Sequence, residues 1–277
     1  MLKQRVITAV VLLAILAGAL AAPSPLPFEA LMAVFVGCAL WEWWRLTLGR
    51  PQDGRLRLPE TAAGIVFGAA LIAWRWQAGG PPEAPGWRWL WIAMSAVWVL
   101  GVAPSLARAD AAAPPRSALL TLFAPVALLA AWSALAAAHG RGIAFLLTLL
   151  ALVWVADIGA YFTGKAFGRR KLAPHISPGK TLEGAVGGIA CAVVLVLACA
   201  AFDGTFGAAL AARWGWGGAA LAALLLAALS IAGDLFESLL KRRAGYKDSS
   251  ALLPGHGGVY DRIDALIPVL PLAMLLV

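Results

Sequence analysis

The chain has 277 residues, of which 62% are hydrophobic and 13% are charged, and its mean hydropathy is +0.83. Soluble domains are roughly 45–50% apolar and 25% charged, so this composition excludes a secreted enzyme and a soluble nucleotide-binding fold. The formal net charge is +8, but the cations lie in short loops between apolar segments, where membrane orientation explains them better than nucleic acid does. The sequence therefore predicts an integral membrane protein that binds no nucleic acid.

About nine apolar segments approach the length of about 20 residues that a helix needs to cross a bilayer core. The predicted fold class is all-α: a single integral membrane domain over residues 1–277, with N-terminal helices in 1–141 and a catalytic region in 142–277. A cleavable signal is the alternative for the first segment, because Lys3 and Arg5 precede it; an uncleaved helix is preferred. The segments are 6–22, 28–47, 61–76, 87–104, 118–138, 142–162, 184–202, 216–240 and 265–277.

Positive charge is distributed unevenly over the loops between these segments. With the N-terminus in the cytoplasm, all of the 22 Lys and Arg residues lie on the cytoplasmic side except Arg75, Arg88, Arg141 and Arg213. The positive-inside rule expects this asymmetry. The two polar loops over residues 163–183 and 241–264 are therefore predicted to face the cytoplasm.

Cysteines and tryptophans are assigned structural roles. Cys38, Cys191 and Cys199 lie inside apolar stretches with no CxxC pair and no nearby His, which is typical of small buried hydrophobes rather than of a zinc site or disulfide. Tryptophans near the segment ends, such as Trp43 and Trp91, are interpreted as an interfacial aromatic belt.

Acids within a span, or at its mouth, are functional candidates because a charge in hydrocarbon costs about 2.5–3.5 kcal/mol. Glu42 has Arg45 three residues later and is interpreted as half of a surface helix pair. Asp157 is a candidate metal ligand, with pairing to Lys165 or Arg169 as the structural alternative. The complete set is Glu42, Asp157, Glu183, Asp234 and Glu237.

One helical face near the end of segment 216–240 carries several polar groups. Asp234, Glu237, Ser238 and Lys241 occupy positions i, i+3, i+4 and i+7 and therefore project from the same face. A structural salt bridge between Glu237 and Lys241 is an equally good interpretation of that pair, but it leaves Asp234 unexplained one turn deeper. We predict that Asp234 is a principal metal ligand and that Glu237 supports it.

The following loop combines cations, glycines and two further acids. Glycines on both sides of His256 free backbone amides to hold phosphate oxygens. Asp261 and Asp264, spaced i and i+3, could direct oxygens at Mg²⁺, which is usually held by one or two carboxylates plus phosphates and water. Asp261 is the second predicted principal ligand and Asp264 a supporting one, with a helix N-cap as the alternative role for Asp264.

The loop before segment 184–202 contains another possible phosphate ligand. Gly179, Lys180 and Thr181 imitate the end of a P-loop, but Pro174 stands where its first glycine should be, and no strand-to-helix context is expected. We reject a P-loop and keep Lys180 as a phosphate ligand.

Residues 238–264 closely resemble, in order and spacing, the signature of the phosphatidate cytidylyltransferase, or CDP-diacylglycerol synthase, family. Residues 157–184 resemble the upstream motif of that family, so the resemblance covers about the last 120 residues; the first half is similar only in hydropathy, and Ala265 stands where many members have serine. The matching signature positions are Ser238, Leu240, Lys241, Arg242, Lys247, Asp248, Ser250, Leu253, Pro254, His256, Gly257, Gly258, Val259, Asp261, Arg262, Ile263 and Asp264.

The resemblance implies a multi-pass enzyme of the inner (plasma) membrane that faces the cytoplasm, joins CTP to phosphatidate and releases pyrophosphate. It also implies Mg²⁺ dependence and a homodimer; the number of cations stays open. The residues assigned to catalysis are Asp234, Asp261, Lys241, Arg242, Asp264 and Ser238. Those assigned to substrate binding are Lys180, Lys247, Arg262, His256, Gly257, Gly258, Asp248 and Ser177. Those assigned to metal binding are Asp234, Asp261, Glu237, Asp264 and Asp157.

The predicted reaction is direct attack of a phosphatidate oxygen on the α-phosphorus of CTP. A phosphate monoester is largely ionised at pH 7, so His256 is predicted to shape the loop or bind phosphate rather than act as a general base, and Ser238 is the alternative nucleophile. The competing classes are a transporter, whose site would lie near the bilayer midplane, a CTP-dependent lipid kinase, which would transfer only the γ-phosphate, and a noncatalytic membrane scaffold.

Overall fold

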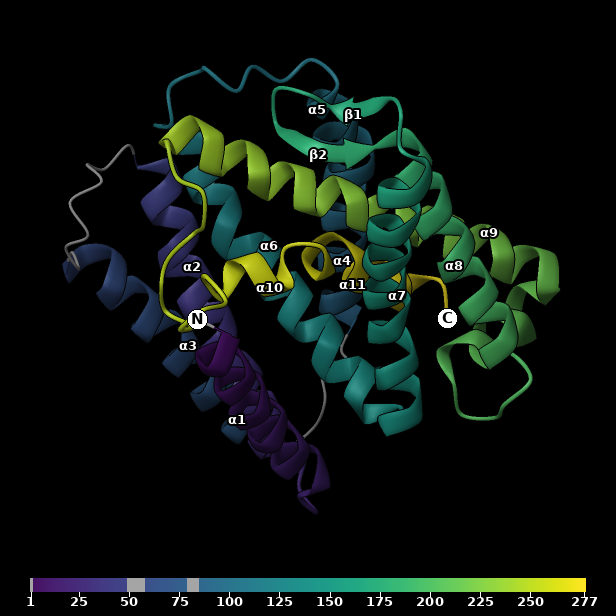
Figure 1. Cartoon of the computed structure of the whole chain (residues 1–277). Coiled ribbons are helices and arrows are strands. Elements are labelled where there is room, and N and C mark those ends of the chain that lie inside the picture. The colour runs from purple at the N-terminus through teal and green to yellow at the C-terminus, as the bar shows by residue number, and fades with distance from the viewer. Residues whose placement is uncertain (1, 49–57, 79–84) are drawn as a thin grey trace.

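The computed structural model describes residues 2–48, 58–78 and 85–277, which are mostly helical (Figure 1). The predicted cytoplasmic cations Arg50, Arg55 and Arg57 lie outside the described residues. The helices are α1 (Leu2–Ala21), α2 (Leu26–Thr47), α3 (Leu58–Ala78), α4 (Pro85–Ala96), α5 (Ala103–Leu106), α6 (Ala118–Gly140), α7 (Ile143–Phe167), α8 (Leu182–Cys199), α9 (Phe206–Ala244), α10 (Tyr260–Ile263) and α11 (Leu266–Leu275), with a π-helical stretch, Val97–Val102, between α4 and α5.

A helix lies at each predicted apolar segment, because a chain in lipid must satisfy its backbone hydrogen bonds internally. Within the described residues, six helical stretches are long and apolar enough to cross a membrane: Leu26–Thr47, Gly86–Leu106, Ala118–Gly140, Ile143–Phe167, Leu182–Cys199 and Phe206–Ala244. By contrast, α11 has 10 residues, or about 15 Å at the rise of an α-helix, which is half of a bilayer core. The count of nine spans and the cytoplasmic N-terminus stay predictions.

Helix α9 begins well before residue 216, where the corresponding segment was predicted to start. Phe206 begins the helix, and the chain bends at Gly215, whose φ of 67° lies in the left-handed region. Only glycine adopts this conformation without steric cost. The long apolar piece therefore starts after Gly215, as predicted, and the difference from the prediction is that a further helical piece from Phe206 fills the stretch expected to be a loop.

Two short strands interrupt the all-helical prediction between α7 and α8. Strands β1 (Lys171–Ala173) and β2 (Ser177–Thr181) form an antiparallel hairpin in which Lys171 pairs with Thr181. Ile176, in the hairpin turn, packs on Leu235 and Leu239 of α9. The hairpin is thus fixed against the helix that carries Asp234.

Helices α7 and α8 pack closely because small residues line their interface. A Cβ atom on Gly184 would lie 2.7 Å from the carbonyl oxygen of Ala160, which is too close for any side chain. The Thr163 hydroxyl donates a hydrogen bond to the carbonyl of Gly184 (3.3 Å) across the same interface. This packing sets Asp157 of α7 beside the hairpin that carries Lys180.

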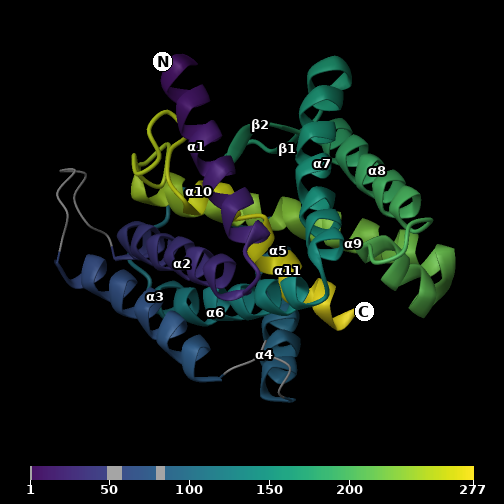
Figure 2. The same cartoon turned by 90° about the horizontal axis from the view of Figure 1, so that it is seen from below.

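Helix α9 crosses the molecule from the side of α2 to the side of α8 (Figures 1 and 2). Where it passes α2, Trp43 contacts Phe236 and stacks on Tyr260, with ring centroids 5.4 and 5.0 Å away. Trp43 and Trp91 are buried, so the prediction of an interfacial belt is wrong for these two. The Trp43 ring forms core contacts between the N-terminal helices and the C-terminal region, whereas Trp91 donates to the Ser133 hydroxyl of α6 (3.0 Å).

Candidate active site

A cavity of about 660 Å³ lies between α7, the β-hairpin, α8, α9 and the segment around α10. We call it the polar cavity. Of the predicted site residues, it is lined by Asp157, Ser177, Lys180, Asp234, Glu237, Lys241, Asp248, Asp261, Arg262 and Asp264. Loops that are distant in sequence therefore meet at one place, as the metal-and-phosphate hypothesis requires.

Three acids form the densest cluster in this cavity. Asp234 and Glu237 lie one turn apart on α9, and Asp264 directly follows α10; each offers an oxygen atom, and these oxygens lie within 4.8 Å of one another. The α9 backbone can approach Asp264 because residue 233 is glycine: a Cβ there would lie 2.6 Å from the Asp264 carbonyl oxygen. We call Asp234, Glu237 and Asp264 the acidic triad.

Glu237 is the most deeply buried member of the acidic triad. It is 1% exposed, and its Oε1 atom has no hydrogen-bond partner within the part of the chain that the structure describes. Buried carboxylate oxygens are costly without a partner. For Asp264, burial and then the negative charge of Asp234 raise the pKa above its ordinary value. A bound cation would relieve both costs.

Two lysines neutralise part of this negative charge. The Nζ atom of Lys180 lies 2.6 Å from Asp234 Oδ2. The Nζ atom of Lys241 lies 2.6 Å from Glu237 Oε2 and 2.8 Å from Asp261 Oδ1. The predicted Glu237–Lys241 pair is present, and Lys241 additionally connects α9 to the segment that carries Asp261.

Asp261 accepts hydrogen bonds from the glycine-containing loop. Its carboxylate accepts from the amides of Gly258 (2.8 Å) and Ser249 (3.1 Å). Burial raises the pKa of Asp261, but hydrogen bonds from Lys241 and the Gly258 amide outweigh burial and hold that pKa below its ordinary range. The Gly258 amide, predicted to hold phosphate, therefore holds the Asp261 side chain in this structure.

Several predicted site residues lie outside the lining of the polar cavity. Arg242 donates from Nε to the carbonyl of Ile176 (3.2 Å), which ties α9 to the hairpin turn. The Ser238 hydroxyl donates to Asp234 Oδ1 over 3.4 Å, and the carbonyl of Gly257 accepts from the Leu253 amide (2.8 Å). Lys247 and His256 are also absent from the described lining.

Glu42 is a residue whose role the sequence interpretation missed. It is fully buried, and its carboxylate accepts hydrogen bonds from the amides of Val259 (3.1 Å) and Tyr260 (2.6 Å) and from the hydroxyls of Ser249 and Ser250. The predicted surface pair with Arg45 is wrong. The available signal was an acid within an apolar helix, which favours a buried partner from elsewhere in the chain over a surface pair.

Arg45 also contacts residues 246–260, which we call the signature loop, rather than forming a surface pair. Its guanidinium donates to the Ser249 carbonyl (3.2 Å) and lies 5.3 Å from the Tyr246 ring centroid. Helix α2 therefore holds residues 246–260 through a buried acid and a stacked cation.

The hairpin base is held by Glu183, another acid singled out from sequence. Its carboxylate accepts from the backbone amides of Arg169 (3.0 Å) and Arg170 (3.1 Å). Next to it, Thr181 caps α8 by accepting from the Gly184 amide (3.1 Å). A strand does precede a helix here, contrary to expectation, but the strand belongs to an antiparallel hairpin, so the rejection of a P-loop does not rest on that context.

Asp157 lines the polar cavity, close enough to Asp234 and Lys180 for their charges to act on it. Lys165 lines the same cavity and was considered from sequence only as a structural partner for Asp157.

The fold and the cavity define a multi-pass membrane protein with an acidic, lysine-lined site. The chain belongs to the cytidylyltransferase family, whose model matches residues 3–277. It is 39% identical to a phosphatidate cytidylyltransferase of Pseudomonas aeruginosa, over 98% of this chain and 95% of the relative. A phosphatidate cytidylyltransferase of Haemophilus influenzae is 34% identical over 98% of this chain and 96% of its own length. One of Staphylococcus aureus is 42% identical over half of each chain.

Proposed function

We propose that this protein is the enzyme that converts CTP and phosphatidate into CDP-diacylglycerol and pyrophosphate. The observation that carries the proposal is the acidic triad beside Lys180 and Lys241 in one cavity of a chain that belongs to the cytidylyltransferase family. The printed names of the relatives support the substrates. Carboxylates and cations together suit a reaction between two phosphates, which depends mainly on positioning and charge neutralisation.

Mg²⁺ is the cation that we propose for the acidic triad. The donors fit it, because carboxylate oxygens are the ligands that this hard cation prefers, and Oε1 of Glu237 has no partner among the described residues. When bound, Mg²⁺ would neutralise negative charge on the CTP phosphates and the leaving pyrophosphate. Asp157 lines the same cavity and is where we place a ligand to a second cation.

Asp261 is the predicted ligand whose surroundings differ most from expectation. Its oxygens already accept from Lys241, Ser249 and Gly258, so we propose that Glu237 and Asp264 join Asp234 as principal ligands and that Asp261 supports the site. A magnesium titration tests this ranking. Asp264→Asn should raise the Mg²⁺ concentration that gives half-maximal activity more than Asp261→Asn does, and the reverse order would restore Asp261 as a principal ligand.

Lys180, Lys241 and Arg262 are the cations that we propose for the substrate phosphates, because all three line the polar cavity. Each lysine is paired with an acid of the cavity, so arriving phosphates would share cations that are already held in place. Ser177 and Asp248 line the same space and would contact the nucleotide or the lipid headgroup.

The proposed chemical step is direct attack of a phosphatidate oxygen on the α-phosphorus of CTP, with pyrophosphate leaving. The acceptor oxygen is already ionised and needs no strong base. Ser238 is a weaker alternative nucleophile, because its hydrogen bond to Asp234 is long at 3.4 Å and the other Asp234 oxygen is paired with Lys180. His256 lies outside the polar-cavity lining, which argues against a general-base role and leaves loop shape or phosphate binding as its proposed role.

We place the enzyme in the bacterial inner membrane with the polar cavity facing the cytoplasm, where CTP is available. The positive-inside distribution of cations supports this orientation. We further propose that the protein is a homodimer, which light scattering of the detergent-solubilised protein would test. A monomer at all concentrations would contradict the dimer without affecting the proposed reaction.

The reaction is tested by giving purified protein in detergent labelled CTP, phosphatidate and Mg²⁺. CDP-diacylglycerol and pyrophosphate are the expected products, whereas a lipid kinase would give CDP and a phosphorylated lipid. Chiral α-thio CTP then tests the step: direct attack inverts the α-phosphorus. Net retention, or a trapped cytidylylated protein, would overturn direct attack and identify Ser238 as the nucleophile to examine.

A further inference from the structure

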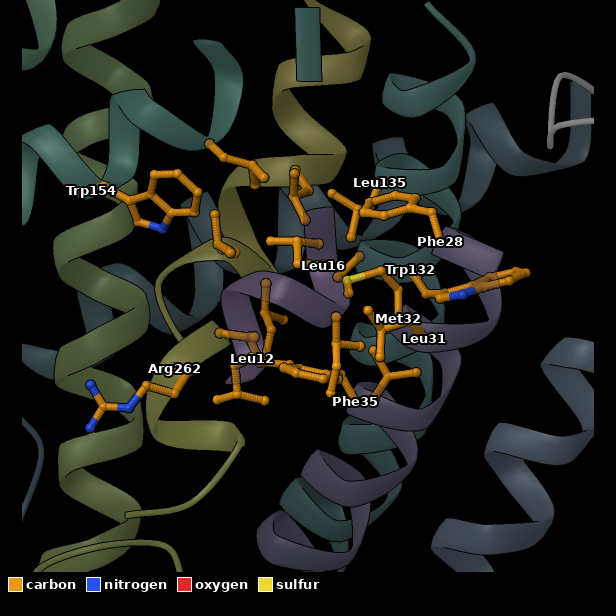
Figure 3. A pocket seen from close by; sticks show the side chains of 18 of the residues that line it. Leu12, Leu16, Phe28, Leu31, Met32, Phe35, Trp132, Leu135, Trp154 and Arg262 are labelled. Carbon is orange, nitrogen blue, oxygen red and sulfur yellow. The ribbon is translucent and has the colours of Figure 1, made fainter. Parts of the chain in front are cut away.

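A second cavity of about 350 Å³ lies beside the polar cavity, and Arg262 lines both. We call it the apolar cavity. Its walls come from α1, α2, α6, α7, the segment around α10 and α11, and they consist of aliphatic and aromatic side chains apart from His256 and Arg262. Figure 3 shows Arg262 at one edge, with its guanidinium directed away from the cluster of Leu12, Leu16 and Phe35. The cavity therefore has one cationic end and an apolar interior.

The apolar cavity opens toward the membrane. Leu13, Ile15 and Trp154 belong to its lining, and all three are exposed on the molecular surface. Its outer wall is α1, which is joined to the signature loop by a hydrogen bond from the Thr8 hydroxyl to the Pro254 carbonyl (3.1 Å). A lipid chain in the bilayer can therefore reach this space from the side.

We propose that the apolar cavity binds one acyl chain of phosphatidate, with the lipid phosphate at Arg262 on the way to the polar cavity. This inference rests on the proposed function and adds where the lipid lies. Two features of the cavity select this occupant: its apolar interior suits a hydrocarbon chain, and its cationic end continues into the cavity that holds the acids. Phosphatidate is a ligand whose phosphate and chains have this arrangement.

Arg262 has hydrogen-bonding capacity left for a phosphate. Its Nε atom donates to the His256 carbonyl (3.1 Å), and one of its terminal nitrogens donates to the same oxygen. Because a guanidinium has five N–H donors, the remaining ones can bind phosphate, and the bonds to His256 hold the group in one orientation. His256 Nδ1 is buried without a partner within the described residues and is a second polar atom at this end.

The apolar cavity would contribute orientation more than affinity. A chain that moves from bilayer to protein leaves one apolar environment for another, so little hydrophobic free energy is gained. A chain fixed beside α11 would instead hold the lipid phosphate in line with the nucleotide, which lowers the entropic part of the barrier. Filling the cavity should therefore impair turnover of long-chain phosphatidate without weakening CTP binding.

A pair of tryptophan substitutions on α1 tests the site. Leu16 is half-buried and lines the cavity, whereas Val10 is exposed and lies outside every described lining. We expect Leu16→Trp to lower kcat/KM for dioleoyl phosphatidate about tenfold, to spare dihexanoyl phosphatidate and to leave the KM for CTP unchanged. Val10→Trp should change none of these. Equal kinetics of Leu16→Trp and wild type on both lipids would overturn the proposal.

Photolabelling provides a readout that does not depend on turnover. A phosphatidate with a diazirine on its acyl chain should label residues 12–16 of α1 and 266–270 of α11 in the full-length protein. Excess phosphatidate should suppress this labelling, and phosphatidylcholine should not. Equal suppression by both lipids would mean that bulk membrane lipid fills the cavity, which overturns the proposal. Loss of all cytidylyl transfer in the wild type would instead contradict the proposed function.

Discussion

The two halves of the chain contribute differently to the site. All described residues that line the polar cavity come from residues 157–264, and the described residues before 142 contribute none. The N-terminal half instead contributes support: Glu42 and Arg45 of α2 bind the signature loop, and Trp43 stacks on Tyr260. The proposed site is therefore lined by the C-terminal half, and contacts from both halves hold it in place.

This division places different physical demands on the two halves. The C-terminal half must keep residue types at fixed spacing, because each acid or lysine has a defined neighbour. The N-terminal half can vary wherever an apolar helix suffices. Glu42 and Arg45 are N-terminal positions whose side chains bond directly to the signature loop.

The largest expected effect is at Asp234, which belongs to the acidic triad and pairs with Lys180. Asp234→Asn keeps the shape but removes the charge, so turnover should fall by about three orders of magnitude or more. Folded protein should persist in the membrane. Asp203→Asn, at an exposed loop position, is the matched control. Near-normal activity of Asp234→Asn at saturating Mg²⁺ would remove Asp234 from the metal site.

The second-largest effect on activity is expected at Lys241, because its side chain contacts two acids of the C-terminal half, Glu237 and Asp261. Lys241→Ala leaves the buried Glu237 carboxylate uncompensated, and breaking a buried pair costs about 3–5 kcal/mol. We expect kcat/KM to fall about 10²- to 10³-fold, with a lower melting temperature in detergent. A matched substitution, Arg243→Ala, removes a neighbouring cation whose Nε donates to the Asp110 carbonyl (2.9 Å). Similar losses in both variants would indicate a general effect of charge.

Much of this site could be predicted from sequence, because its parts depend on local spacing. The helical period places Asp234, Glu237 and Lys241 on one face, and the structure brings them together. Local spacing could not show that Asp261 turns toward the Ser249 and Gly258 amides. That orientation depends on how the loop folds back on itself.

Contacts between distant segments were the main source of error. Glu42 lies more than 200 positions before its partners, and no local pattern records such a pairing. The helical piece that begins at Phe206 was missed because residues 203–215 were interpreted as a loop, whereas only Gly215 within α9 departs from helical geometry. Hydropathy predicted where helices occur, but it could not predict which helices the buried acid connects.

Glu42 offers the sharpest test of support from the N-terminal half. In Glu42→Gln, the side-chain amide would face one of the two backbone amides that now donate to separate oxygens, Val259 to Oε1 and Tyr260 to Oε2. Two donors cannot bond to each other. We expect kcat to fall about 10- to 100-fold and hydrogen exchange at both backbone amides to accelerate.

Val34→Ala provides the control for Glu42→Gln, because Val34 lies on the same helix and is exposed. This variant should match the wild type in both measurements. Unchanged exchange and activity in Glu42→Gln would show that the N-terminal half is an apolar support without a specific contact. The two halves would then differ only in that the C-terminal half supplies the residues of the proposed site and the N-terminal half supplies apolar helices.

The smallest effects are expected at Arg242 and Lys247, which lie close to Lys241 in the sequence but outside the described polar-cavity lining. Arg242→Ala removes the bond to the Ile176 carbonyl and loosens the hairpin that carries Lys180, so the KM for CTP should rise a few-fold while kcat changes less.

Lys247→Ala should leave both constants within about twofold, because a cation outside the cavity contributes mainly to membrane orientation. Steady-state kinetics with each substrate varied separately measure both. A rise of more than about tenfold in either KM for Lys247→Ala would mean that the loop closes over the substrates during turnover, and the glycine-containing segment would then act as a mobile part of the site rather than as a support for Asp261.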